Sequence, residues 1–333
     1  MAKFVEFHQT GGPEVLQIVE KEPSTPGDNE LLVKIKAAGL NQAELLYFMG
    51  HYVFQPKFPS KVGLEASGIV ANKGKNVTDF ELGDEVCLTP NIMHYEYGYL
   101  GEYALVPGEA IIKKPKSLSF DEAASFWMTY ATSYTGLVLK GGLNKGADQT
   151  VVISAASSAV GIAAIQMAKN FGARVIATSR TFEKKDFLES QGADFVIATE
   201  EENFVEKVNE FTEGEGFQIA FDPIGGTFWN ELADAAGQEA RIIVYGALSL
   251  DFESPFPTLL TFVKGLSFIG FHLVFHLLQH PNRFEKVKKH LLEGLEQRIY
   301  KPVIDRSFTL EEMQNAYEYM MSGKQKGKIL VKP

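Results

Sequence analysis

The side chains most suited to chemistry in this chain form a run of very small residues that follows an apolar stretch at 150–154. They are Ser157, Ser158, Ala159, Val160 and Gly161. Small side chains let a backbone come close to a phosphate, and the two serine hydroxyls can donate hydrogen bonds to its oxygens. A helix that begins within this run would add N–H groups and the positive end of its dipole. The run is therefore a candidate for binding a pyrophosphate.

The elements predicted around this run have the order of a dinucleotide-binding fold. Residues 150–154 are a β-branched apolar run typical of a buried parallel strand, and residues 160–171 have helical spacing of apolar side chains. A second strand is predicted directly afterwards, at 174–178. The glycine pattern is incomplete, because Ala156 and Ser158 stand where the G-x-G-x-x-G fingerprint has its first two glycines. An ordinary strand–helix turn without a nucleotide is therefore an alternative interpretation.

The end of the second strand carries hydroxyl and cationic side chains instead of a carboxylate. Proteins that bind NAD place an acidic residue here to accept hydrogen bonds from the ribose 2′-hydroxyl. In this chain Ser179 and Arg180 occupy the strand end, and Lys184 or Lys185 adds positive charge one turn later. Arg180 can contact a 2′-phosphate through two parallel hydrogen bonds, whereas a carboxylate would repel it. The sequence therefore predicts NADPH as the cofactor, with a solvated cationic loop as the alternative.

Composition and charge limit the other classes of function. The 333 residues are 45% hydrophobic, which supports a sizeable core, and their net charge of −10 argues against a nucleic-acid surface. No apolar run approaches the about 18 residues of a membrane span, and the N-terminus lacks the layout of a signal peptide. Cys87 is the only cysteine, which excludes an internal disulfide and fits a reducing compartment. We therefore expect a cytoplasmic protein with no nucleic-acid or membrane partner.

The predicted elements change in rhythm near residue 125, which indicates two domains. Strands of the first part are expected at 31–37, 66–72, 83–87, 101–106 and 110–113. The second part alternates strands at 150–154, 174–178, 194–197, 217–222, 240–245 and 266–270 with helices at 160–171, 183–190, 201–211 and 226–236. The tail adds helices at 281–297 and 309–321 and a strand at 328–331. We expect an α/β fold in which a six-stranded parallel Rossmann domain, 125–270, is inserted in a β-rich domain, 1–124 and 271–333, with a ligand cleft between them.

Short motifs occur in a fixed order along nearly the whole chain. They are Gly-Gly-Pro-Glu-Val-Leu at 11–16, Ala-Gly-Leu-Asn at 38–41, Gly-His-Tyr at 50–52, Gly-Leu-Glu at 63–65, Gly-Asp-Glu-Val at 83–86, Gly-Glu-Tyr at 101–103 and Gly-Lys-Ile-Leu-Val at 327–331. Together they resemble the medium-chain dehydrogenase/reductase superfamily, and within it the zinc-independent quinone oxidoreductases. The resemblance implies that the β-rich domain is GroES-like. It also implies a homodimer formed by edge strands of the nucleotide sheets, here the strand at 266–270.

The same resemblance implies that the chain holds no metal. Zinc members of the superfamily place a cysteine where Asn41 stands and a histidine where Leu64 precedes Glu65, and a single cysteine cannot build their four-cysteine site. A row at four-residue spacing, His272, His276 and His280, is a possible ligand set or simply a polar helix face. Without zinc there is no Lewis acid to assist alcohol oxidation. This favours reduction of conjugated carbonyls.

Further cofactor-binding positions are implied by the resemblance alone. Asn41 and Thr132 match positions that face the nicotinamide. The other positions expected at the cofactor are Tyr245, Gly246, Ala247, Gly270, Phe271 and Lys328. Asp222, at the end of the fourth predicted Rossmann strand, either lies beneath the cofactor or caps a turn.

The expected chemistry is hydride transfer, which places negative charge on the carbonyl oxygen of the acceptor and requires a hydrogen-bond donor and a proton. Asn41 is expected to donate through its amide. Tyr52 is the best acid, because related enoyl-thioester reductases use a tyrosine at the matching position. Tyr52 could equally form an apolar wall for a flat ring. Other aromatic residues expected near the acceptor are Tyr47, Phe48, Phe54, Tyr95, Tyr97 and Tyr99.

These observations predict an NADPH-dependent reductase of quinones or α,β-unsaturated carbonyls, with Tyr52 and Asn41 as catalytic residues and a small-molecule substrate. The alternatives are an enoyl-thioester or 2-alkenal reductase on the same scaffold and a non-catalytic, crystallin-like NADPH-binding protein. The loop at 90–100 is expected to set substrate preference.

Overall fold

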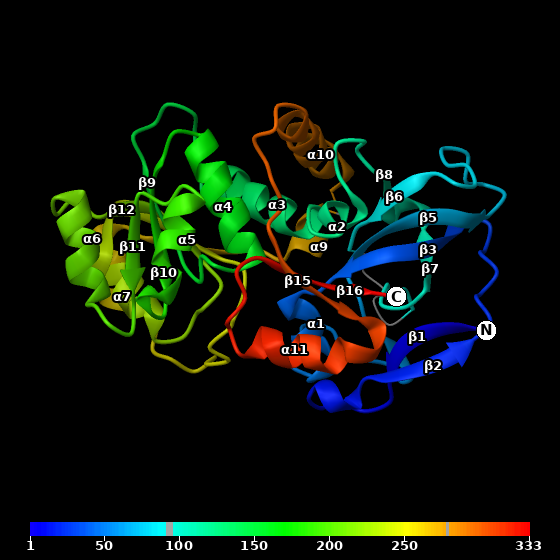
Figure 1. Cartoon of the computed structure of the whole chain (residues 1–333). Coiled ribbons are helices and arrows are strands. Elements are labelled where there is room, and N and C mark those ends of the chain that lie inside the picture. The colour runs from blue at the N-terminus through cyan, green and yellow to red at the C-terminus, as the bar shows by residue number, and fades with distance from the viewer. Residues whose placement is uncertain (91–95, 278–279) are drawn as a thin grey trace. The chain divides into compact units, whose positions relative to one another are not determined.

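The chain folds into two units, each defined by the contacts within it. A computed structural model describes residues 1–90, 96–277 and 280–333 (Figure 1). Unit 1 contains Met1–Met128 and Pro302–Pro333, and unit 2 contains Thr129–Lys301.

These boundaries differ from the expected ones at residues 125–128, which were expected in the Rossmann domain and lie in unit 1. They also differ at residues 271–301, which were expected in the first domain. In the structure they belong to unit 2, and helix α10 (Pro281–Glu296) lies among them. The His290 ring of α10 lies 4.4 Å from the Tyr134 ring and 5.8 Å from the Phe171 ring, measured between centroids. Contacts between residues so far apart in the chain leave no periodic signal in the sequence.

Unit 1 is built on two sheets among its described residues. The larger has the order β15 (Ile304–Thr309), β16 (Lys328–Lys332), β3 (Glu30–Gly39), β5 (Glu65–Lys73), β6 (Glu85–Leu88) and β8 (Ile111–Lys113), with β7 (Tyr103–Pro107) also on β3. The smaller has the order β2 (Gln17–Lys21), β1 (Ala2–Phe7) and β4 (Ser60–Lys61). Its helices are α1 (Gln42–Phe48), α2 (Phe120–Ala123) and α11 (Met313–Met321). Alternate residues of β3, among them Leu31, Val33 and Ile35, are buried in its core, as the alternating pattern predicts.

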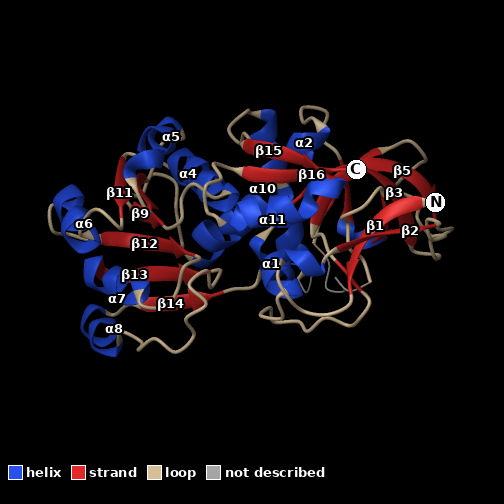
Figure 2. Cartoon of the chain, turned by 60° about the horizontal axis from the view of Figure 1, so that its bottom comes forward, coloured by secondary structure: helices blue, strands red, loops and turns tan. Residues whose placement is uncertain are grey.

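Unit 2 contains the predicted six-stranded parallel sheet. Its order is β11 (Phe195–Ala198), β10 (Arg174–Ser179), β9 (Thr150–Ile153), β12 (Phe217–Asp222), β13 (Ala236–Val244) and β14 (Ser267–Gly270). Every pairing in it is parallel, and Figure 2 shows β12, β13 and β14 side by side. The fold class is confirmed.

The helices of unit 2 connect or follow these strands. They are α4 (Ala159–Asn170), α5 (Lys185–Ser190), α6 (Phe204–Thr212), α7 (Phe228–Ala235), α8 (Thr258–Lys264), α9 (Leu273–Leu277) and α10. Helix α3 (Trp127–Ser133) runs from unit 1 into unit 2 and continues as a π-helix, Tyr134–Lys140. No helix in the described part of the chain combines the length and the apolar character needed to cross a bilayer.

Candidate active site

The turn between β9 and α4 is shaped to receive an anionic group. Ser158 is the N-cap of α4, and its Oγ accepts a hydrogen bond from Gly161 N at 3.0 Å. A Cβ on Gly161 would lie 2.5–2.7 Å from backbone atoms of Ala156, so only glycine lets the helix start pass this close to the strand end. The N–H groups of Ala159 and Val160 have no intrahelical acceptor, because they lie in the first turn. The Ser157 and Ser158 hydroxyls can still donate to a ligand.

Lys184 joins this turn to the end of β10. Its Nζ donates to Ser157 Oγ at 2.9 Å, which places a positive charge beside the predicted pyrophosphate-binding turn. Arg180 is exposed at the end of β10. The Ser179 hydroxyl donates to Thr181 O at 2.6 Å, so its proton is already engaged. A 2′-phosphate at this end of the sheet would therefore meet the positive charges of Arg180 and Lys184 and not a free Ser179 proton.

The remaining cofactor candidates of unit 2 follow the ends of β13 and β14. The register pairs Val244 with Gly270, so the segments that continue from them leave the sheet at the same edge. These segments carry Tyr245, Gly246 and Ala247, and Phe271, whose N–H donates to Val244 O at 3.1 Å. This edge also carries the β9–α4 turn, since the carboxyl ends of parallel strands meet there. Apart from Thr132, which lies in α3, the structure therefore brings the predicted nucleotide-binding residues of unit 2 to one edge of one sheet.

Tyr245 and Asp222 are linked at this edge by a hydrogen bond from Tyr245 N to Asp222 O at 3.1 Å. The Tyr245 ring stacks on Phe221 with 4.0 Å between centroids, and its hydroxyl is buried with no hydrogen-bond partner within the described residues. Asp222 accepts hydrogen bonds from Gly225 N at 2.9 Å and Trp229 Nε1 at 3.1 Å. These contacts support the turn-capping interpretation of Asp222. Burial raises the pKa of its carboxyl above the ordinary value.

Unit 1 contains a second group of predicted site residues, joined through Lys328. Its Nζ donates to Asn41 Oδ1 at 2.7 Å and forms an ion pair with Glu65. The Asn41 Nδ2 donates to Gly39 O at 3.0 Å and to Glu44 Oε1 at 3.2 Å. Both N–H groups of the Asn41 amide therefore have acceptors inside the protein, which differs from the expected role of Asn41 as a donor to a substrate.

Glu44 also binds Asn41 through hydrogen bonds. Its carboxylate accepts hydrogen bonds from Asn41 N at 3.2 Å, Leu64 N at 2.7 Å and the Tyr317 hydroxyl at 2.8 Å. Burial raises the pKa values of Glu44 and Glu65, and Lys328 opposes both increases. With 1% of each glutamate and 2% of Lys328 exposed, these groups are shielded from water, so the Lys328 ammonium is a charge that stabilises the ionised form of both carboxyl groups.

Sequence reasoning missed Glu44 and Tyr317. The spacing of Asn41 and Glu44 at the start of α1 is that of a capping box and offered a signal for the first. No local pattern pointed to Tyr317, which lies in α11, far along the chain.

Tyr52 lies in an aromatic environment of unit 1. Its ring centroid is 6.4 Å from that of Tyr47 and 5.9 Å from that of Phe54. Burial, followed by the charge of Glu44, raises the pKa of the Tyr52 hydroxyl. Thr132 is buried in α3 of unit 2. Tyr95, which was expected to contribute to the acceptor site, lies outside the described residues.

The possible metal ligands do not form a cluster. Among the described residues no three His, Cys, Asp or Glu side chains come together in a way that could hold a metal ion. The His276 ring nitrogen Nδ1 lies 3.3 Å from His272 O, and burial lowers the pKa values of both histidines.

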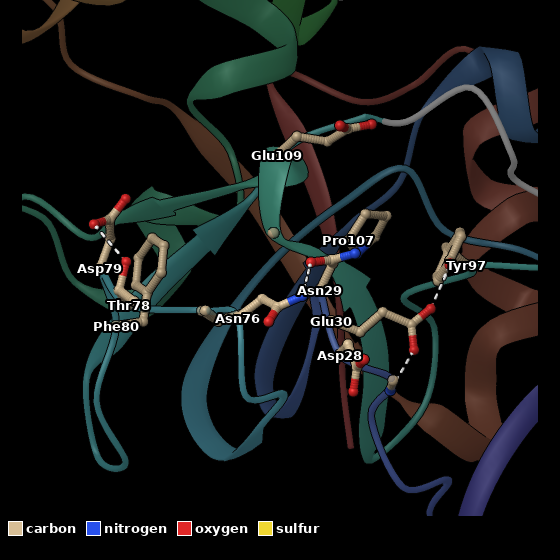
Figure 3. Close-up of a pocket in the computed structure, with 13 residues that line it drawn as sticks. Asp28, Asn29, Glu30, Asn76, Thr78, Asp79, Phe80, Tyr97, Pro107 and Glu109 are labelled. Carbon is tan, nitrogen blue, oxygen red and sulfur yellow. Dashed lines mark hydrogen bonds between the residues drawn. The ribbon is translucent and has the colours of Figure 1, made fainter.

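A cavity of about 600 Å³ in unit 1 is unsuited to an anionic nucleotide. Figure 3 shows four carboxylates on its lining, those of Asp28, Glu30, Asp79 and Glu109. Phosphate groups would be repelled there. Tyr97, which was expected near the acceptor, lines this cavity, and its hydroxyl donates a hydrogen bond to Glu30. The residues predicted to be catalytic or to bind the cofactor do not line it.

Two family models match the chain. Residues 27–116 match the alcohol dehydrogenase GroES-like domain, and residues 159–293 match the zinc-binding dehydrogenase family. The quinone oxidoreductase-like protein 2 homolog of Nematostella vectensis is 32% identical over 318 residues, which are 94% of this chain and 85% of that protein. The chain belongs to the quinone oxidoreductase-like group of the medium-chain dehydrogenase/reductase family. The resemblance inferred from the short motifs is confirmed.

Other members of this family give a consistent result. Quinone oxidoreductase 1 of Escherichia coli is 34% identical over 250 residues, 74% of this chain and 73% of that protein. The structure of an Escherichia coli quinone oxidoreductase in complex with NADPH matches with a TM-score of 0.90 and 27% identity, over 99% of this chain and 100% of that one.

Proposed function

We propose that this family member is an NADPH-dependent reductase of quinones and α,β-unsaturated carbonyl compounds. The observation that carries the proposal is the cationic end of β10, where Lys184 reaches the β9–α4 turn through Ser157 at 2.9 Å. A similar protein, the quinone oxidoreductase of Escherichia coli, has been solved with NADPH. The residues of unit 2 fit this nucleotide because they offer free N–H groups, hydroxyls and two cations at one sheet edge.

Each part of that edge would hold a different part of the nucleotide. The first turn of α4, with Ser157 and Ser158, would bind the pyrophosphate, and Arg180 and Lys184 would bind the 2′-phosphate. The buried, unpartnered hydroxyl of Tyr245 belongs to the segment expected beside the nicotinamide ribose. When bound, NADPH supplies the hydride.

The acceptor also needs a proton, and Tyr52 is the proposed donor for enones. Because the pKa of Tyr52 is raised, its hydroxyl remains protonated at neutral pH. It can therefore give its proton more readily to an enolate, which is a strong base, than to a weaker base. A hydroquinone anion is a weaker base and can take its proton from water. Tyr52 should consequently matter more for enones than for quinones.

We further propose that the reaction needs no zinc. Asn41 and Leu64 occupy positions where zinc members of the family carry a cysteine and a histidine. The carboxylate of Glu65, which follows the second of these positions, is paired with Lys328. A buried ammonium beside this carboxylate supplies the compensating charge that a metal would otherwise provide.

The test is NADPH consumption by the purified protein with three acceptors: a small quinone, an enal and a crotonyl thioester. We expect turnover with the quinone and the enal, unchanged after treatment with a chelator. Preferential reduction of the thioester would favour the enoyl-reductase alternative. Tight NADPH binding without turnover of any acceptor would favour a crystallin-like role.

We also propose a homodimer formed through β14 and the region before it. Large apolar side chains are unusually exposed there: Phe252 is 71% exposed, Leu259 72%, Phe262 83% and Val263 60%. Strand β14 is an edge strand of the sheet among the described residues, and an open edge beside an apolar patch favours a second copy as partner. Sedimentation at low micromolar concentration should give a dimer, and Phe262→Lys should give monomers. A wild-type protein that sediments only as a monomer would contradict the proposal.

A further inference from the structure

The amide of Asn41 has only one orientation that satisfies its neighbours. An ammonium is exclusively a donor, so the amide atom 2.7 Å from Lys328 Nζ must be the oxygen. The carbonyl of Gly39 and the carboxylate of Glu44 are acceptors, so the atom facing them must be the nitrogen. Rotating the amide by half a turn would place donor against donor and acceptor against acceptor.

We infer that Lys328 is a positioning residue that fixes the Asn41 amide in this orientation, so that Asn41 offers a ligand an acceptor and not a donor. Both N–H groups face Gly39 and Glu44, while Oδ1 has a second lone pair besides the one used by Lys328. The ligand group that Asn41 contacts is therefore a hydroxyl or another donor. The inference rests on the proposed function in taking that ligand to be the nucleotide, whose ribose hydroxyls are donors of this kind.

Neighbouring residues confine the Lys328 side chain to this position. A Cβ on Gly39 would lie 2.6 Å from Lys328 Cε, so the glycine makes room for the lysine side chain. Glu65 Oε1 forms the ion pair with Lys328, and Glu65 Oε2 accepts from Met128 N at 3.3 Å. The ion pair with Glu65 therefore fixes the Lys328 ammonium, and the hydrogen bond from this ammonium fixes the Asn41 amide.

In this arrangement Asn41 has a role in the reaction that differs from the expected one. Negative charge that develops on the acceptor oxygen is not stabilised by the Asn41 amide, because both of its N–H groups already bind internal acceptors. Asn41 instead contributes to ligand binding, and Lys328 acts through Asn41.

The test begins with the ligand-free protein labelled with ¹⁵N at asparagine side chains, with Asn41→Ala used to assign the Asn41 signal. We expect the Asn41 side-chain N–H groups to be protected from hydrogen exchange, and to remain protected with saturating NADPH. Fast exchange in the free protein would overturn the inferred orientation. Loss of protection when NADPH binds would show that the Asn41 amide leaves Gly39 and Glu44, and would overturn the acceptor role.

Variants test whether Lys328 sets this orientation. Lys328→Met alone leaves Glu65 buried without its cation, so the double variant Glu65→Gln with Lys328→Met removes both charges and keeps the volume similar. We expect the double variant to lose Asn41 protection and to bind NADPH about tenfold more weakly, while kcat changes less. Lys328→Arg should recover most of the affinity, because it restores a charged donor.

The matched control is Lys332→Met on the same strand, where Lys332 Nζ pairs with Asp121 Oδ2 at 2.6 Å on the partly exposed side. It should leave Asn41 protection and NADPH affinity unchanged. If the double variant behaves like this control, Lys328 does not position Asn41. Failure of the wild type to bind NADPH would refute the proposed function but not the orientation, since the exchange measurement on free protein requires no ligand.

Discussion

Lys184 Nζ lies 2.9 Å from Ser157 Oγ, so one hydrogen bond connects the cationic segment after β10 with the turn that begins α4. The two segments are expected to bind different phosphates of one nucleotide. A cation that touches both is well placed to discriminate NADPH from NADH.

Replacing this cation should weaken NADPH selectively. In Lys184→Ala we expect KM for NADPH to rise about tenfold, because one charge-assisted contact to the 2′-phosphate is lost, and KM for NADH to change little. Steady-state kinetics with both nucleotides measure this. Lys185→Ala is the control, since Lys185 is the next residue and pairs with Glu189 at 3.6 Å. Equal changes for both nucleotides would exclude a phosphate-specific role.

Tyr52→Phe should separate the two acceptor classes. We expect kcat with an enal to fall about 10- to 100-fold, within the range of general acid catalysis, while quinone reduction stays within about twofold. Because burial raises the pKa of Tyr52, its hydroxyl should add no titration to the wild-type profile between about pH 6 and 9. Small and equal effects on both acceptors would remove Tyr52 from the mechanism.

Asp222→Asn should alter the pH dependence of stability in unit 2. Burial raises the pKa of Asp222 in the folded state. Its contribution to the free energy of unfolding is therefore complete below the unfolded-state pKa of about 4, and is lost as the pH rises through the folded-state pKa. The variant has no carboxyl group at this position, so its stability does not change in this way. The free energy of unfolding of the wild type should therefore fall relative to that of the variant as the pH rises from about 4 through the folded-state pKa of Asp222. Urea unfolding from pH 4 to 8 measures the difference.

Asp251→Asn supplies a control of opposite sign. Hydrogen bonds from Ser254 and Glu253 N hold the pKa of Asp251 below its ordinary value, so its contribution is lost as pH falls. If the Asp222 variant and wild type lose stability in parallel at every pH, the buried carboxylate does not titrate as inferred.

Gly136→Ala should disturb the packing beneath Tyr245. A Cβ at Gly136 would overlap the Phe221 ring, on which Tyr245 stacks. We expect destabilisation of about 1–3 kcal/mol, as for other overpacked cores. Adding Phe221→Leu should recover part of this loss, because the two changes share one contact. Additive losses in urea unfolding would show that Gly136 and Phe221 are not coupled.

The six parallel strands could be predicted because burial on both faces requires continuous apolar runs, as in Val151, Val152 and Ile153. The residues that follow the strands could be placed together because the carboxyl ends of parallel strands meet at one edge of a sheet. The sequence did not indicate that α10 packs within unit 2, since that depends on His290 meeting Tyr134 and Phe171 across long separations.

The candidate site of unit 1 was predictable in part. Motif resemblance identified Asn41 and Lys328, but the hydrogen bond between them joins positions 287 residues apart. Whether an amide acts as donor or acceptor depends on such neighbours. The expected donor role of Asn41 therefore could not be checked until Glu44 and Gly39 were placed around it.

The proposed function requires this chain to bind a phosphorylated nicotinamide nucleotide at the edge of the unit 2 sheet. Titration calorimetry with NADPH and then NADH, on protein treated with a chelator, tests it most directly. We predict one NADPH per chain, with NADH at least tenfold weaker. No detectable NADPH binding, equal affinity for the two nucleotides, or binding that requires added zinc would contradict the proposed function.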